Sequence, residues 1–353
     1  MSKICIVGTS NLKHISLISL YTCIFDELDI PYDVVYTARY GIKEKSSAKR
    51  QYCYSAKGMK TRLAKIKELL RFRRFTKKII KKNKYDFIIT WQTTCAYLFF
   101  DILFFKFNKR YIVNIRDYVI ENNKFFYFLL KLLVKNSAFS TISSEGFLKF
   151  LPPAQYVKVN SVNLNLIDSV IPLKYKPTRP YKIGFAGNCR YFNESYRLVD
   201  ALKNDDRFEL WFCGTNSDVL AKYAECHNIQ NVKTMPAFDV NETINIMERF
   251  DIVNSAFGND AMDNRTLLPI RLYLAAAICK PTLANEHTQL ASFIRKYSLG
   301  FVIKEYSTLA DELVEYFDTL NGDSFCNSCN EFLKSAKKEN EYFCLRVREC
   351  IGM

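Results

Sequence analysis

The stretch from Tyr181 to Tyr191, YKIGFAGNCRY, joins an apolar run to a glycine and then to a helical pattern that begins near Asn193. A buried strand that runs into a glycine and a helix is typical of a parallel sheet covered by helices. The same unit recurs at 208–214, FELWFCG, before a second helical pattern. Because strand and helix signals go on alternating to residue 303, the second half of the chain is predicted to be a doubly wound α/β domain.

The first half of the chain shows the same alternation. The stretch 171–180, IPLKYKPTRP, holds three prolines and no periodicity, which makes it the best candidate linker. We therefore expect an α/β protein with two Rossmann-like doubly wound domains that share a cleft, residues 1–170 and residues 181–322, joined by the linker. The strand signals of the first half lie at 3–8, 33–37, 85–90, 110–115, 138–143 and 156–160.

Positive charge is concentrated in the first half of the chain. Residues 1–176 carry 31 Lys and Arg against 12 Asp and Glu, a balance of +19, whereas residues 177–353 carry 20 against 24, a balance of −4. Twelve of the basic residues lie at 60–84, where aliphatic and aromatic residues interleave with them. Such a helix suits an anionic membrane surface. Nucleic acid also fits the charge, but no nucleic-acid-reading motif accompanies it, and we expect no nucleic-acid partner.

The cysteines favour a reduced compartment. Twelve are spread singly along the chain, and several lie inside strand patterns, so we expect a cytoplasmic protein without a disulfide framework. Cys326 and Cys329 have zinc-like spacing, but Cys344 and Cys350 lack the close second pair, so no metal site is predicted. No stretch reaches the roughly 20 apolar residues that a membrane-spanning helix needs.

The loops that follow strands hold the candidate ligand residues, because ligands of parallel sheets bind beyond the carboxyl ends of the strands. Gly187, Asn188 and Arg190 lie between a strand and a helix, where a glycine lets the backbone approach a ligand and an arginine suits a diphosphate. An ordinary turn with a solvated arginine explains this loop equally well. Arg265 and Arg271, near the start of another helix, form a second candidate, for which the alternative is a solvated helix face.

Two loops of the first domain hold candidate catalytic residues. His14, in the segment SNLKH after the first strand, is a candidate general base, and Ser10 and Asn11 precede it. Asp117 has the same position after a later strand, next to Arg116, where a carboxylate would position an acceptor hydroxyl. A structural histidine and an Arg116–Asp117 surface ion pair are the alternatives. Ser10, Asn11 and Arg116 are the expected acceptor contacts.

In their order and spacing, these segments resemble the bacterial GT-B glycosyltransferases of capsule, O-antigen and exopolysaccharide synthesis. The resemblance runs over roughly positions 3 to 303 and includes IVNSAFG at 252–258. SSEGFLKFLP at 143–152 is similar to a segment near the end of the family's acceptor domain, and YKIGFAGNCRY to the opening of its donor domain. LPIRLY at 268–273, followed by Lys280-Pro281, is similar to the family's "LPN-[KR]-LYEA … G-[KR]-P" signature.

The resemblance implies metal-independent transfer of a sugar, with no cofactor beyond the nucleotide-sugar substrate. The second domain would hold the donor, with Gly187 to Arg190 and Arg271 at its diphosphate and Gly214 and the Met235–Phe238 loop near its base. The first domain would hold an acceptor, often a lipid-linked saccharide, at the inner face of the bacterial plasma membrane. The helix at 323–353 would cross back to the first domain.

One departure from the family pattern concerns the donor ribose. The family's ribose-binding glutamate is replaced by Leu274, which cannot accept hydrogen bonds, and the asparagine after the proline is Ile270. Either another carboxylate, such as Glu286 or Asp263, takes that role, or donor binding is weak or lost. A catalytically inactive subunit of a polysaccharide assembly complex is therefore the main alternative. A nucleotide-sugar epimerase would need clustered acid and base residues that the sequence does not show, and a nucleic-acid-binding protein rests on the basic helix alone.

Overall fold

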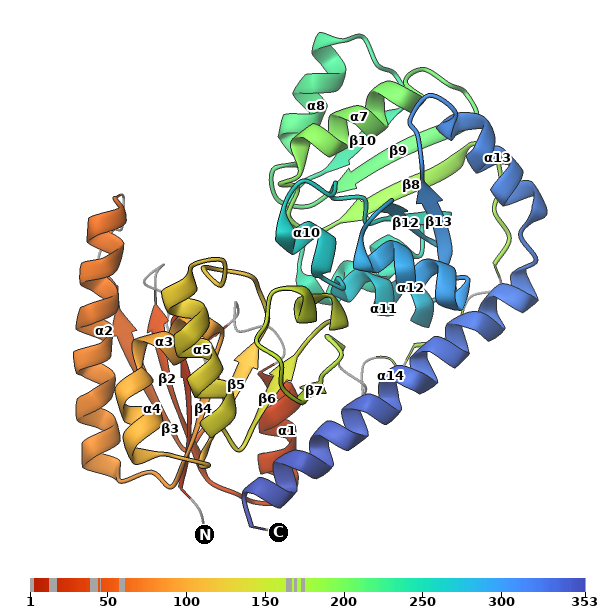
Figure 1. Cartoon of the computed structure of the whole chain (residues 1–353). Helices are drawn as coiled ribbons and strands as arrows, with labels where there is room; N and C mark the ends of the chain where they lie inside the picture. The colour runs from red at the N-terminus through yellow and green to blue at the C-terminus, as the bar shows by residue number, and fades with distance from the viewer. Residues whose placement is uncertain are drawn as a thin grey trace. The chain divides into compact units, whose positions relative to one another are not determined.

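The computed structural model describes residues 3–12, 18–38, 44, 46–56, 61–162, 167, 170–172 and 175–352. Its contacts divide the chain into unit 1, Met1–Asn163 with Lys338–Met353, and unit 2, Leu164–Lys337. Each unit contains one sheet in which every paired strand is parallel to its neighbour, with helices between the strands (Figure 1). The predicted fold, two Rossmann-like α/β domains, is therefore confirmed. The stretch 171–180, expected as a linker, falls within unit 2.

Unit 1 has a seven-stranded sheet with the order β3-β2-β1-β4-β5-β6-β7. Its strands are β1 (Ile4–Gly8), β2 (Tyr32–Ala38), β3 (Arg50–Ser55), β4 (Phe87–Trp91), β5 (Tyr111–Ile115), β6 (Phe139–Ile142) and β7 (Tyr156–Lys158). Its helices are α1 (Ser19–Glu27), α2 (Arg62–Asn83), α3 (Thr93–Leu98), α4 (Phe100–Lys106), α5 (Lys124–Asn136) and the 3-10 helix η2 (Glu145–Lys149). The edge strand β3 was not predicted, because its sequence RQYCYS is polar and only partly buried.

The central strands of unit 1 are buried along their whole length, which explains why they read as continuous apolar runs. One face of the sheet packs against α1 and the last turns of α14 (Gly322–Cys350), where Phe343 meets Tyr21 edge to face with ring centroids 4.8 Å apart. Side-chain caps begin two of the helices: Thr61 accepts from Ala64 N at α2, and Asn123 accepts from Phe125 N at α5.

Unit 2 has a six-stranded sheet with the order β10-β9-β8-β11-β12-β13. Its strands are β8 (Tyr181–Ala186), β9 (Phe208–Cys213), β10 (Val232–Met235), β11 (Ile252–Asn254), β12 (Thr282–Asn285) and β13 (Gly300–Ile303). Its helices are α7 (Phe192–Leu202), α8 (Ser217–Cys226), η3 (Val240–Glu242), α9 (Thr243–Met247), α10 (Met262–Thr266), α11 (Ile270–Ala277), α12 (Gln289–Tyr297), α13 (Leu309–Thr319) and the first part of α14.

Two apolar cores cover the two faces of this sheet. One joins the strands to α7, α8 and α13, and the other joins them to α9 and α11. Helix α14 belongs to unit 2 up to Lys337 and to unit 1 from Lys338 (blue in Figure 1). Among the described residues, no helix combines the length and the apolar character needed to cross a bilayer.

Candidate functional site

The first candidate site lies at the carboxyl ends of β8, β9 and β11. Strand β8 is hydrogen-bonded to β9 on one side and to β11 on the other. The chain first adds β9 and β10 on one side of β8 and then crosses to the other side to add β11, β12 and β13. Ligands of open parallel sheets bind at this switch point. The residues that follow the three strands begin at Gly187, Gly214 and Ser255.

Two glycines bring the loops after β8 and β9 into contact. Gly187 and Gly214 have φ angles of +139° and +128°, which other residues rarely adopt. A Cβ on Gly214 would lie 1.9 Å from the carbonyl oxygen of Gly187. Asn216 adds a side-chain link, because its Nδ2 donates to Asn188 Oδ1 at 3.1 Å. The backbone of this region is therefore held close together, with the side chain of Asn188 exposed.

Arg271, the second residue of α11, lies against this backbone. Its Nη1 donates to the carbonyl oxygen of Ala186 at 2.7 Å, and a Cβ on Gly187 would lie 3.0 Å from the same nitrogen. The guanidinium carbon is 4.0 Å from the ring centroid of Phe185 and 5.0 Å from that of Phe257. Helix α11 thus positions an arginine next to Gly187, and its role toward a diphosphate stays a prediction.

The charge of Arg271 is not neutralised by a carboxylate among the described residues, since no ion pair involves it. Although the residue keeps some exposure, its Nε is buried and has no hydrogen-bond partner. Burial lowers the pKa of Arg271 to about 10. A partly buried cation that lacks a carboxylate and retains a free donor favours an anion as its ligand.

The two other arginines predicted to bind the donor, Arg190 and Arg265, are both exposed. Arg190 is exposed and folds onto its neighbour, with Nη2 donating to Tyr191 Oη at 2.9 Å, and Tyr191 stacks on Phe257 with ring centroids 4.7 Å apart. Arg265 is also exposed, and its Nη2 donates to the carbonyl oxygen of Asp260 at 3.1 Å. Neither arginine has a carboxylate partner within the described residues.

Leu274 lies in an apolar cluster, where it is 7% exposed. Met235 and Phe238, the residues expected near the donor base, pack against the same cluster. Glu286, one of the carboxylates expected at the donor ribose, forms an ion pair with Arg295 and lines a separate pocket. Arg295 lowers the pKa of Glu286, which therefore stays charged.

Unit 1 brings a second group of polar residues to the carboxyl ends of β1, β4 and β5. Asp117 is exposed and accepts a hydrogen bond from Gln92 Nε2 at 2.8 Å. Arg116 turns the other way, with Nη1 donating to Ser161 Oγ at 3.0 Å and its guanidinium carbon 5.5 Å from the Trp91 ring centroid. No Arg116–Asp117 ion pair is present, so the aspartate presents its carboxylate to solvent.

Asn11, after β1, is fully buried, and its Nδ2 donates to Glu44 Oε2 at 3.3 Å. Ser10 is half-buried beside it. The predicted base His14 lies outside the described residues. Glu44 and Gln92 were not predicted: Gln92 has φ +71° directly after β4, where the sequence WQTT shows only a polar residue at a strand end. Its position directly after a strand, which Asp117 shares, is the signal that could have indicated it.

No group of three or more His, Cys, Asp or Glu side chains in the described part of the chain is arranged to hold a metal ion. The cysteines that were considered for zinc, Cys326 and Cys329, lie on α14.

No protein-family model matches the chain, and no curated protein is similar to it in sequence. Solved structures share its fold. Sucrose-phosphate synthase from Thermosynechococcus elongatus matches with a TM-score of 0.77 and 11% identity, over 99% of each chain. Anabaena HepE in complex with UDP matches with a TM-score of 0.69 and 12% identity, over 99% of this chain and 100% of that one. WaaG, a glycosyltransferase involved in lipopolysaccharide biosynthesis, matches with a TM-score of 0.63 and 11% identity, over the whole of both chains. The chain therefore has the two-domain GT-B fold of these proteins.

Proposed function

We propose that this protein is a glycosyltransferase that moves a sugar from a nucleotide-sugar donor, bound by unit 2, to a glycan acceptor, bound by unit 1. The observation that carries the proposal is Arg271, a cation without a carboxylate partner that lies against Gly187 at the switch point of the unit 2 sheet. The fold supports it, since of the three solved structures described above one is a sucrose-phosphate synthase by name, one is a glycosyltransferase by name, and the third is a complex with UDP.

The leaving group of such a reaction is a nucleoside diphosphate, on which negative charge develops as the glycosidic bond breaks. Preorganised donors and cations stabilise that charge, and they require no metal ion to do so. Arg271 supplies a partly exposed cation beside Gly187, and a charge-assisted hydrogen bond from its guanidinium to a phosphate oxygen would stabilise that charge. Arg190 and the start of α7, which follows Gly187 to Tyr191, supply further positive potential on the same loop.

Asp117 is the group that we assign to the acceptor. Its exposed carboxylate, oriented by Gln92, would accept the proton of an acceptor hydroxyl as that oxygen attacks the sugar. Arg116, which turns away from Asp117 and donates to Ser161, is not assigned a role in this step. We propose UDP as the nucleotide of the donor, because the HepE structure is a complex with UDP.

We also infer that unit 1 meets an anionic membrane surface, at the inner face of a bacterial plasma membrane, where a lipid-linked acceptor would lie. On the basic helix α2, the side chains of Leu63, Ile66 and Leu70 are 73, 47 and 48% exposed. Their spacing of three and four residues places them on one helix face, among lysines and arginines. An exposed apolar stripe within a cationic helix suits the interface of an anionic bilayer.

The inactive-subunit alternative is favoured by one observation. Leu274 occupies a buried apolar cluster, so that position offers no carboxylate to a ribose. Such a protein would still bind a glycan or a nucleotide, but it would not turn over.

The deciding experiment is turnover. The protein is incubated with UDP-glucose, UDP-galactose, UDP-N-acetylglucosamine or GDP-mannose, with and without a bacterial lipid extract as acceptor, and nucleotide release is followed. The proposal predicts release that depends on the lipid extract and is lost in Arg271→Met. Binding of a nucleotide without any release, across all four donors, would support the inactive subunit instead.

A further inference from the structure

Unit 2 has a large pocket that the proposed donor site does not use. It has a volume of about 710 Å³ and lies beyond the carboxyl ends of β12 and β13, along one side of α7. A volume of this size accommodates a ligand of one to a few rings. Arg271, Gly187 and Gly214 do not line it.

The wall of the pocket contains a buried carboxylate. Glu194 is 6% exposed, and its Oε1 accepts from both Asn285 Nδ2 and Tyr306 Oη. Burial, followed by the hydrogen bond to the Glu194 carboxylate, raises the pKa of Tyr306 above its usual range, so the phenol stays protonated and donates. Glu194 Oε2 has only a long contact, 3.5 Å, with the largely exposed Arg197. Each carboxylate oxygen accepts two hydrogen bonds, so Oε2 has capacity for a ligand hydroxyl.

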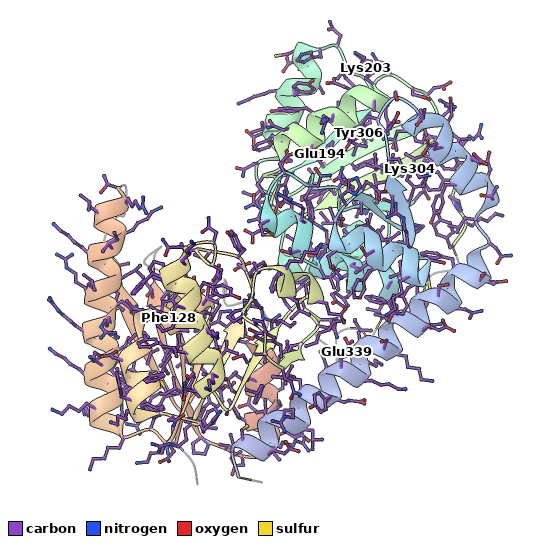
Figure 2. The ribbon with its side chains drawn as sticks, in the orientation of Figure 1. Phe128, Glu194, Lys203, Lys304, Tyr306 and Glu339 are labelled. Atoms are coloured by element: carbon purple, nitrogen blue, oxygen red, sulfur yellow. The ribbon has the colours of Figure 1, made fainter. Side chains whose placement is uncertain are left out.

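Other lining groups add donors and an aromatic surface. Asn259 donates through Nδ2 to the carbonyl oxygen of Glu286 at 3.1 Å, and its Oδ1 has no hydrogen-bond partner among the described residues. The guanidinium carbon of Arg197 lies 5.5 Å from the centroid of the Tyr306 ring. Lys304 is exposed at the rim, close to Tyr306 and Glu194 (Figure 2). The hydroxyls on neighbouring carbons of a sugar each donate and accept hydrogen bonds. They can therefore pair with the carboxylate, amide, phenol and ammonium groups of this lining.

The balance of charge selects among polar ligands. The lining holds four carboxylates and two cations, a net charge of −2, and remains at −1 if Glu286 is counted as neutralised by Arg295. A negative wall repels phosphate and nucleotide groups and favours an uncharged ligand. The lining carboxylates are Glu194, Asp200, Glu286 and Glu305, and the lining cations are Arg197 and Lys304.

We propose that this pocket, formed by Glu194, Asn259, Asn285, Tyr306, Arg197 and Lys304, binds a neutral saccharide. The inference goes beyond the proposed transfer reaction, because it assigns unit 2 a saccharide site next to its anion site. The two sites share one loop. Phe257 packs against Arg271, whereas Gly258 donates through its backbone N to Asn285 Oδ1 at 2.8 Å in the pocket wall. The saccharide is a glycan separate from the donor, because Arg271, Gly187 and Gly214 do not line the pocket.

The test uses the full chain and two tryptophan substitutions. Ser307 is exposed and lines the pocket, so Ser307→Trp places an indole ring at its mouth. Lys203 is an exposed residue just after α7 that does not line the pocket (Figure 2), so Lys203→Trp is the matched control. Glucose, galactose, N-acetylglucosamine and glucose 6-phosphate are the probes, and saturation-transfer NMR titrations measure their binding. UDP binding is measured on the same samples by calorimetry.

We expect millimolar binding of at least one neutral sugar, at least tenfold weaker in Ser307→Trp and unchanged in Lys203→Trp. Glucose 6-phosphate should bind more weakly than glucose. Tyr306→Phe, which keeps the ring and removes the donor to Glu194, should weaken binding severalfold. The affinity for UDP-glucose should be the same in Ser307→Trp as in the wild type. A loss of UDP-glucose affinity larger than the loss of UDP affinity would show that the pocket takes the donor's sugar and would overturn the separate glycan site.

Two results would overturn the proposal: no neutral sugar binds the folded wild type, or Ser307→Trp binds sugars as the wild type does. A stronger affinity for glucose 6-phosphate than for glucose would overturn the charge argument and with it the neutral ligand. UDP calorimetry separates a failure of the saccharide site from a failure of the proposed function. UDP binding that persists when no sugar binds would leave the donor site intact, because the residues named for the two sites do not overlap.

Discussion

Replacing Arg271 with methionine should weaken nucleotide binding without destabilising the protein. Burial lowers the pKa of Arg271 from its usual value to about 10. At 1.36 kcal/mol per pH unit, this difference corresponds to roughly 3 kcal/mol of cost for keeping the charge in the folded protein. Methionine removes that cost, which stabilises the folded state. It also removes the cation–π contact with Phe185, worth about 1–2 kcal/mol, and one hydrogen bond, worth about 1 kcal/mol, and these two losses offset the gain. The free energy of unfolding should therefore stay unchanged or rise slightly.

Nucleotide affinity should respond in the opposite direction. A hydrogen bond to a charged group contributes about 1.5–3 kcal/mol, which corresponds to roughly 10- to 150-fold in the dissociation constant. Calorimetry with UDP on the wild type and on Arg271→Met measures this ratio, and urea unfolding of the ligand-free proteins measures stability. The affinity of the wild type should also fall as the pH rises above 10, because the anion binds the protonated guanidinium.

Two outcomes would refute this reasoning. An Arg271→Met variant that is folded and binds UDP within twofold of the wild type would show that the cation does not contact the ligand. A variant that is several kcal/mol less stable would show that the arginine serves the core of unit 2 rather than a ligand.

Three further predictions concern other elements. Gly214→Ala forces a Cβ to within 1.9 Å of Gly187 O at a φ of +128°, so it should lower the unfolding free energy of unit 2 by about 2–4 kcal/mol, seen in the urea midpoint; an unchanged midpoint would contradict the close approach. Asp117→Asn should lower kcat about 10²- to 10⁴-fold and leave UDP affinity unchanged, and equal turnover would exclude Asp117 as the base. Hydrogen bonds from Arg207 lower the pKa of Asp205 in the folded protein. The ionised carboxylate therefore stabilises the fold at pH values above 3.8, its model-compound pKa. This contribution is lost as the pH falls through the lower pKa of the folded state. Asp205→Asn should therefore cost up to about 1 kcal/mol at pH 7 and progressively less as the pH falls below 3.8, and a cost that does not change with pH would point to lost packing instead.

The alternation of strands and helices predicted the fold well, since the central strands are buried on both faces and read as unbroken apolar runs. The exceptions have local causes. Strand β3 lies at the sheet edge and is polar, and the five-residue α10 is too short to show a helical period. The sequence also predicted Arg271 as a ligand residue, from its position after a proline near a helix start, and the structure places it next to Gly187.

What the sequence did not predict depends on contacts between distant segments. The burial of Arg271 between Phe185 and Phe257 joins residues from three different elements, and no local pattern indicates it. The link from Gln92 to Asp117 likewise joins the ends of two neighbouring strands. The carboxylate proposed for the ribose, Glu286, was assigned from chain position alone, whereas the structure pairs it with Arg295 beside a different pocket.

The most direct test of the central claim is calorimetric titration of the wild type with UDP, GDP and CMP, repeated with Arg190→Ala and Arg271→Met. The account predicts saturable binding of one nucleoside diphosphate, weakened by Arg271→Met by at least tenfold and by the exposed Arg190→Ala by less. If the folded protein binds none of the three, or binds one equally well without Arg271, unit 2 does not hold a nucleotide-sugar donor where the account places it.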